Sequence, residues 1–113
     1  MNEIKTIVNA ETRLSFSEKL TVSILYETEK EMTCQEIRQR FLERYGVDYK
    51  DTTMYTFLKN LKEKGYITSY KRGVTFYTVA VPRNEFIQRE MEEVVSIIFE
   101  GDKEAAVKFM QSM

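Results

Sequence analysis

The order of hydrophobic and polar positions predicts three helices in the first two thirds of the 113-residue chain. In three successive stretches apolar side chains recur every three or four residues, which places them on one face of a helix. Two stretches begin with a capping box, a hydroxyl residue followed three positions later by glutamate: Ser15 with Glu18, and Thr33 with Glu36. The predicted helices cover about residues 16–29, 34–44 and 52–64.

After Gly65 the pattern changes to that of β-strands. The stretch YITSYKRGVTFYTVAV is rich in β-branched and aromatic residues, and Lys71-Arg72-Gly73 interrupts it as a turn would. We expect a hairpin with strands over residues 67–70 and 75–81, ended by Pro82.

A broad apolar face marks the C-terminal part. From Asn84 a helical pattern returns, and beyond Gly101 we expect Asp102 to cap a last short helix. One short terminal helix could not cover so wide a face, so it is expected to dimerise or to close these helices on each other. The residues expected to do so are Met91, Val94, Val95, Ile98, Phe99, Val107, Phe109 and Met110.

Three helices followed by a hairpin are the elements of a winged helix-turn-helix. The predicted fold class is therefore α+β, mainly helical with a small β-hairpin. We assign residues 1–83 to a winged-helix DNA-binding domain and residues 84–113 to a C-terminal helical dimerisation segment. In this fold the third helix enters the major groove of DNA.

The outward face of the third predicted helix has no carboxylate from Thr52 to Lys62. A carboxylate there would meet the closely spaced phosphates of a duplex, whereas hydroxyls, an amide and lysines can reach base edges or phosphate oxygens. Hairpin lysine and arginine are expected at phosphates or in the adjacent minor groove. The predicted DNA-binding residues are Lys50, Thr52, Thr53, Tyr55, Thr56, Lys59, Asn60, Lys71 and Arg72.

Charge is unevenly distributed, although the net charge is only −1. Residues 35–83 hold 10 Lys/Arg against 5 Asp/Glu, whereas residues 84–113 hold 3 against 7. A basic middle segment and an acidic end indicate that the two parts have different roles.

The residues that most enzymes and metal sites need are scarce. Histidine is absent and Cys34 is the single cysteine, so the usual general base, zinc sites of the Cys/His kind and an internal disulfide are not available within one chain. We expect no enzyme activity, no cofactor and no metal. No apolar run approaches the length of a membrane helix, and the first ten residues do not resemble a secretory signal. A cytoplasmic location is expected.

Two other classes of function remain open from the residues alone. A winged helix can also bind protein, in which case binding would depend weakly on salt and DNA would not be retained. A regulator could instead sense a small molecule between its C-terminal helices, in which case an effector would stabilise it thermally.

The runs LSFSEKLTVSILYE, TCQEI, TTMYTFLKNLKEKGYI, FYTVAVPRNEF and IIFEGDKEAAVKF together resemble the penicillinase-repressor family, which includes the BlaI, MecI and CopY repressors. The similarity runs from about Leu14 to Met110. It implies a bacterial homodimeric repressor that binds a palindromic double-stranded DNA operator through its winged helix.

The family's recognition-helix motif falls on residues 53–61, where Thr53 and Thr56 match and Asn60 replaces the usual arginine. Tyr49 and Lys19 stand where the family has tryptophans. Asparagine can pair with adenine, whereas arginine favours guanine or phosphate, so the resemblance does not extend to the operator sequence of the known family members.

The resemblance also implies how repression could be relieved. In the β-lactam branch a receptor protease triggers cleavage at an Asn-Phe bond, and the matching bond here is Lys108-Phe109. The copper-responsive branch binds metal through paired C-terminal cysteines, which this sequence lacks.

Overall fold

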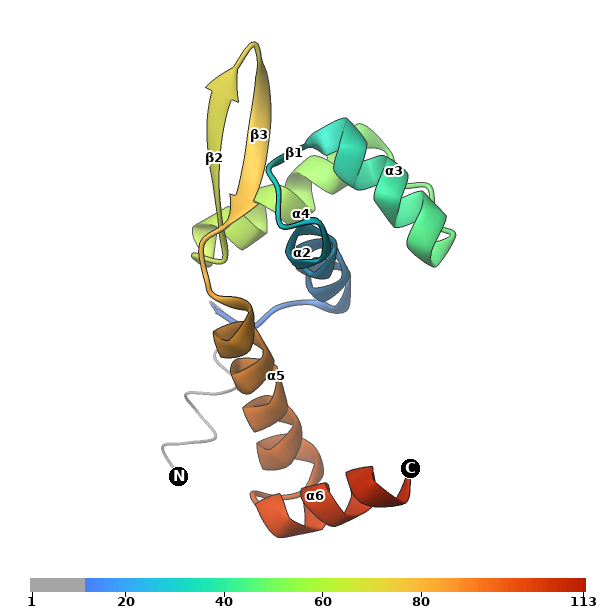
Figure 1. The fold of residues 1–113 in the computed structure, drawn as a ribbon, viewed down its shortest axis with the longest axis vertical. Helices are drawn as coiled ribbons and strands as arrows, with labels where there is room; N and C mark the ends of the chain where they lie inside the picture. The colour runs from blue at the N-terminus through green and yellow to red at the C-terminus, as the bar shows by residue number, and fades with distance from the viewer. Residues whose placement is uncertain (1–11) are drawn as a thin grey trace. The chain divides into compact units, whose positions relative to one another are not determined.

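The computed structural model describes residues 12–113, so the prediction about the first ten residues lies outside the described part of the chain. Figure 1 shows the elements in order. They are α2 (Phe16–Thr28), β1 (Met32–Thr33), α3 (Cys34–Tyr45), α4 (Asp51–Glu63), β2 (Ile67–Arg72), β3 (Val74–Val79), α5 (Arg83–Ile98) and α6 (Lys103–Ser112). The predicted α+β class with a winged helix is confirmed.

Both predicted capping boxes are present at the starts of α2 and α3. Ser15 Oγ accepts from the Glu18 amide at 3.2 Å, and a Glu18 carboxylate oxygen accepts from the Ser15 amide at 3.0 Å. Thr33 and Glu36 form the same pair of bonds at 3.2 and 2.9 Å. These bonds satisfy amides that the first turn of a helix leaves without partners.

The first unit, Leu14–Pro82, has its own hydrophobic core between the three helices and the base of the hairpin. Each helix contributes the apolar stripe that its spacing predicts. The largest fully buried apolar side chains are Val22, Ile24, Leu25, Ile37, Phe41, Met54, Leu58, Leu61 and Ile67.

Within the described part of the chain the sheet has three strands in the order β1-β3-β2, all antiparallel. The sequence pattern did not predict β1, a two-residue strand in which Met32 pairs with Tyr77. The hairpin is also tighter than expected: Arg72 pairs with Val74, and Gly73 alone forms the tip at φ 76°. Lys71 and Arg72 therefore lie in β2 rather than in a turn.

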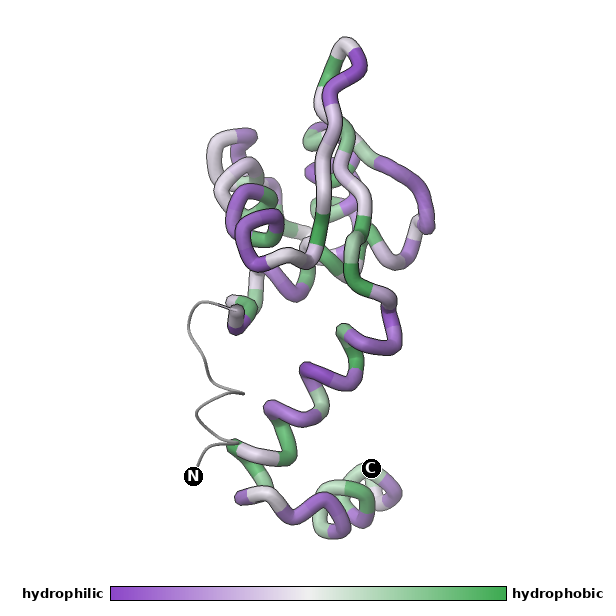
Figure 2. The backbone as a smooth tube through the Cα atoms, turned by 90° about the vertical axis from the view of Figure 1, so that its left-hand side faces the viewer, coloured by the Kyte–Doolittle hydropathy of each residue, from purple (hydrophilic) through white to green (hydrophobic). Residues whose placement is uncertain are grey.

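The second unit contains α5 and α6, and Arg13 joins it through an ion pair with Glu93 at 3.5 Å. Glu100 and Gly101 have left-handed backbone conformations that end the preceding helix. Asp102 Oδ1 then accepts from the Ala105 amide at 3.0 Å, as expected for a cap. Figure 2 shows hydrophobic and hydrophilic residues alternating along both helices.

None of the helices described between residues 12 and 113 is both long enough and apolar enough to cross a lipid bilayer.

Candidate nucleic-acid interface

The N-terminus of α4 is held by Arg38 of α3. The guanidinium of Arg38 bonds to Asp51, the first residue of α4, at 3.0 Å, and to Asp48 in the preceding loop at 3.1 Å. Asp51 also suits the positive end of the helix dipole. The negative charge of Asp51 is thus paired with Arg38. Lys50, the cap residue just before it, is exposed.

An aromatic series packs beneath α4. The ring centroids of Phe41 and Tyr49 lie 5.2 Å apart, and those of Tyr49 and Phe57 lie 5.1 Å apart, both pairs edge to face. Because Tyr49 sits between α3 and α4, it fixes the loop that joins them. Tyr49 thus contributes one aromatic contact to α3 and one to α4.

The structure exposes most of the predicted contact residues on one face of α4. Thr52, Tyr55, Thr56 and Lys59 are exposed, and Thr53 is half-buried at the edge of this face. The Thr56 hydroxyl donates to the Thr52 carbonyl at 3.0 Å, which leaves its oxygen free to accept. Glu63, the last residue of α4, is also exposed, so the face is free of carboxylates only up to that residue.

Asn60 does not lie where the sequence pattern predicts. Its side chain is half-buried on the flank of α4 that faces α2, and its amide donates to a carboxylate oxygen of Glu18 at 3.2 Å. The outward-facing position expected for Asn60 is therefore corrected. A helix places Asn60 about 40° from Lys64, and both residues reach the same buried partner.

Glu18 is the centre of that contact. Its side chain is only 3% exposed, and it accepts from Lys64 Nζ at 2.6 Å as well as from Asn60 and the Ser15 amide. Burial by itself would raise the pKa of Glu18. The hydrogen bonds from Lys64, Ser15 and Asn60 outweigh burial, so the net pKa lies below the usual value.

Cys34 lies at the start of α3 beneath Tyr55 and is buried. Its pKa is raised, first by burial and then by the nearby charge of Asp51. A protonated, buried thiol is a poor nucleophile.

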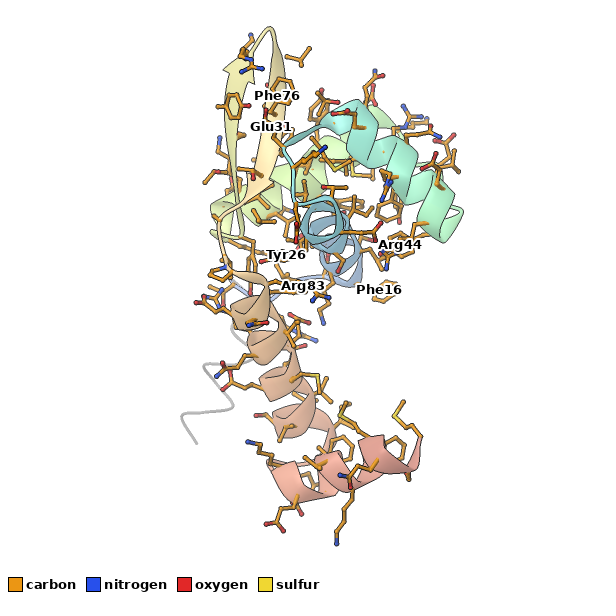
Figure 3. The ribbon with its side chains drawn as sticks, viewed as in Figure 1. Phe16, Tyr26, Glu31, Arg44, Phe76 and Arg83 are labelled. Carbon is orange, nitrogen blue, oxygen red and sulfur yellow. The ribbon has the colours of Figure 1, made fainter. Side chains whose placement is uncertain are left out.

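The wing presents Lys71 and Arg72, both exposed, on β2. Tyr70 and Phe76 are opposite one another in the hairpin, and their rings stack with centroids 5.5 Å apart. The Arg72 guanidinium carbon lies 5.9 Å from the centroid of Phe76. A hydrogen bond with Glu31 is the main cause of a raised Tyr70 pKa, and Figure 3 labels Glu31 and Phe76 in this region.

A cleft of about 360 Å³ separates α4 from the hairpin. Lys62 and Ser69 meet at its edge, where Lys62 Nζ donates to Ser69 Oγ at 2.8 Å. Neither residue was among the predicted contacts. The pattern placed Lys62 on the outward face, but the register of β2, which brings Ser69 beside it, could not be obtained from spacing. The lining residues are Tyr55, Thr56, Leu58, Lys59, Lys62, Ser69 and Tyr77.

The apolar side chains predicted for dimerisation lie on α5, α6 and the turn between them, and no α5 side chain is buried within the described part of the chain. Met91, Val95 and Phe99 are half-buried. Ile87 and Ile97 are exposed on α5 as well and were not predicted. The remaining predicted side chains, all exposed, are Val94, Ile98, Val107, Phe109 and Met110.

The Lys108-Phe109 bond lies inside α6, and both side chains are exposed. Phe109 packs on Phe99 with the ring centroids 6.0 Å apart. The predicted cleavage bond is therefore in a helical backbone conformation. In residues 12–113 no cluster of three or more potential metal-ligating side chains occurs.

A three-helix core, a hairpin wing and an exposed third helix with hydroxyls and lysines define a winged-helix DNA-binding regulator. Residues 14–112 match the family model described as penicillinase repressor, so the chain belongs to the penicillinase repressor family. This confirms the resemblance seen in the sequence and places the chain among transcription regulators rather than enzymes.

No curated protein shows significant similarity to the chain. Among solved structures, a chain in the complex structure of hsRosR-S1 is similar, with a TM-score of 0.57 and 16% sequence identity over 88% of this chain and 89% of that one. At such low identity the likeness concerns the fold alone.

Proposed function

We propose that the chain is a transcriptional repressor that binds a palindromic DNA operator as a homodimer in the cytoplasm. Membership of the penicillinase repressor family supports this proposal. The observation that carries it is the face of α4 formed by Thr52, Tyr55, Thr56 and Lys59, which is exposed while the opposite face is fully buried.

In this proposal α4 enters the major groove. Thr52 and Thr56 reach base edges, Tyr55 contacts the DNA backbone through its exposed ring, and Lys50 at the helix start binds phosphate. Thr53, half-buried at the edge of the face, forms a hydrogen bond through its hydroxyl with the DNA backbone along the same groove. Lys71 and Arg72 on the wing bind the phosphates or minor groove next to it. Asn60 supports the position of α4 instead of reading a base, because its amide is bound to Glu18.

The second unit supplies the dimer contact. Val94, Ile98 and Phe109 are 39%, 68% and 57% exposed within the described chain, and a large exposed apolar surface is typical of an interface. A two-fold axis through α5 and α6 would present two α4 helices to successive major-groove faces, about 34–36 Å or a multiple of this apart.

Relief of repression by cleavage at Lys108-Phe109 would remove Phe109 and Met110 from that contact. A receptor protease is the proposed agent, by likeness to the β-lactam branch of the family. Cleavage would weaken the dimer and, through it, operator binding.

Selection of bound sequences from a random duplex library tests the central claim. A palindromic motif is the expected result. Fluorescence anisotropy on that motif across salt should then give a log–log slope of about −5 to −9, as roughly six to ten neutralised phosphates per dimer require. A flat salt response with no enriched motif would instead favour a protein-binding module.

A further inference from the structure

The cleft between α4 and the hairpin has the chemistry of an anion site. Its edge carries the ammonium groups of Lys59 and Lys62 and the hydroxyl of Ser69, and its lining contains no carboxylate. Within residues 12–113 neither lysine forms an ion pair. Two such charges on one edge favour an anionic occupant.

Lys62 is held in place before any ligand arrives. Its ammonium donates to Ser69 across the turn from α4 to β2 at 2.8 Å, which uses one of its three protons and leaves two for another acceptor. Lysine normally has a flexible side chain, so this contact reduces the entropy lost when it binds.

The floor of the cleft is apolar. Leu58 and Tyr77 are buried beneath it, and the half-exposed ring of Tyr55 forms part of its wall. A small free anion would use the lysines and leave this surface unused. A sugar-phosphate unit would use both, because deoxyribose has an apolar edge.

We propose that this cleft seats one backbone phosphate of the operator, with its deoxyribose against Tyr55, and that Lys62, oriented by Ser69, is the residue that binds it. The proposal rests on the proposed function and adds a contact between the recognition helix and the wing. Lys62 is on α4 and Ser69 is on β2. One bound phosphate would therefore position both the helix and the hairpin on the same DNA strand.

The test combines a protein variant that lacks the Lys62 charge with DNA duplexes in which one backbone phosphate is replaced by a neutral group. Lys62→Gln removes the charge and leaves a polar side chain one atom shorter, and Lys103→Gln, the same change at an exposed lysine in the other unit, is its matched control. Salt titrations on the selected operator should give a slope smaller by about 1 per protomer for Lys62→Gln and an unchanged slope for the control. The selected motif should stay the same.

A series of duplexes, each with one neutral methylphosphonate at a different backbone position, then identifies the phosphate that binds in the cleft. The wild type should lose affinity at one position per half-site, and Lys62→Gln should be insensitive at that same position, which is the non-additive result of a direct contact. Ser69→Ala keeps the charge, so it should weaken binding about 2- to 10-fold with the slope unchanged.

Equal slopes for Lys62→Gln and wild type, or additive losses at every position, would overturn the proposal while leaving operator binding intact. Thermal stabilisation of the wild type by inorganic phosphate, without any change of slope on DNA, would overturn it in favour of a free anion. Failure of the wild type to bind any duplex would refute the proposed function itself. Thermal unfolding of each variant verifies that it is folded.

Discussion

Asn60 donates a hydrogen bond from its side-chain amide to the carboxylate of Glu18 over 3.2 Å, and so ties α4 to the start of α2. The same carboxylate accepts from Lys64, the C-cap residue directly after α4. One residue of α4 and its C-cap are therefore fixed to one buried acceptor.

Asn60→Ala is expected to lower stability without changing the operator sequence. The variant loses a hydrogen bond to a charged, buried acceptor, which costs about 1–2 kcal/mol in the free energy of unfolding. Urea unfolding measures this loss. Selection of bound duplexes should return the wild-type motif.

Thr56→Ala is the matched control, since Thr56 is one turn earlier on the exposed face. It should leave stability nearly unchanged and relax the preference at one base pair per half-site, by about 1–3 kcal/mol. A shifted motif for Asn60→Ala at wild-type stability would mean that the amide leaves Glu18 and reads a base.

Stability should fall in acid through Glu18. Its pKa is lower in the folded chain than in the unfolded one, since its hydrogen bonds outweigh burial. The folded state therefore binds fewer protons, and the stabilisation is fully present above the unfolded pKa and is lost as the pH falls through the folded pKa. Glu18→Gln should be less stable at pH 7 and should lose less stability between pH 5 and pH 3. An identical acid profile for the variant would assign the transition to other carboxylates.

Helix starts were predictable because their signals are local. A hydroxyl and a glutamate three residues apart cap their own helix, and both such boxes occur in the structure at Ser15 and Thr33. The apolar stripe of α4 was equally clear, since Met54, Leu58 and Leu61 are buried at the predicted spacing.

Long-range partners were not predictable. The sequence assigns Glu18 to the cap of its own helix. Nothing in the sequence indicates that the same carboxylate also accepts a hydrogen bond from Asn60, which is 42 residues away. The β1 strand is only two residues long and is defined by its pairing with β3. The meeting of Lys62 with Ser69 likewise depends on where β2 begins. These features come from tertiary packing, which periodicity does not record.

Cleavage at Lys108-Phe109 should be limited by unwinding of α6, because the bond is inside a helix while proteases bind extended chain. Ala105→Gly weakens the same helix by about 1 kcal/mol, so limited digestion with trypsin should cut after Lys108 about fivefold faster than in the wild type, where opening precedes cleavage. Mass spectrometry of the fragments follows this bond. Equal rates in the two proteins would show that α6 is already open there.

The dimer contact is tested by charge placed on the exposed part of the apolar face. Val94→Asp with Ile98→Asp puts two carboxylates where a partner would bury them, which costs several kcal/mol at the contact. Both side chains are already exposed in the single chain, so folding of the unit Leu14–Pro82 should be unaffected. Sedimentation velocity at micromolar concentration should give a dimer for the wild type and a monomer for the variant. Operator affinity should fall toward the non-specific level, because one α4 helix alone can then engage only a half-site.

Gln88→Asp is the control for that variant, since Gln88 is an exposed polar residue on the same helix and gains the same kind of charge. It should remain dimeric and keep its operator affinity. A wild type that sediments as a monomer would remove the basis for a two-fold operator complex and leave the apolar face of α5 and α6 for another partner. A dimeric double variant would place the contact elsewhere on the chain. Loss of the dimer with full operator affinity would mean that each winged helix binds its site independently.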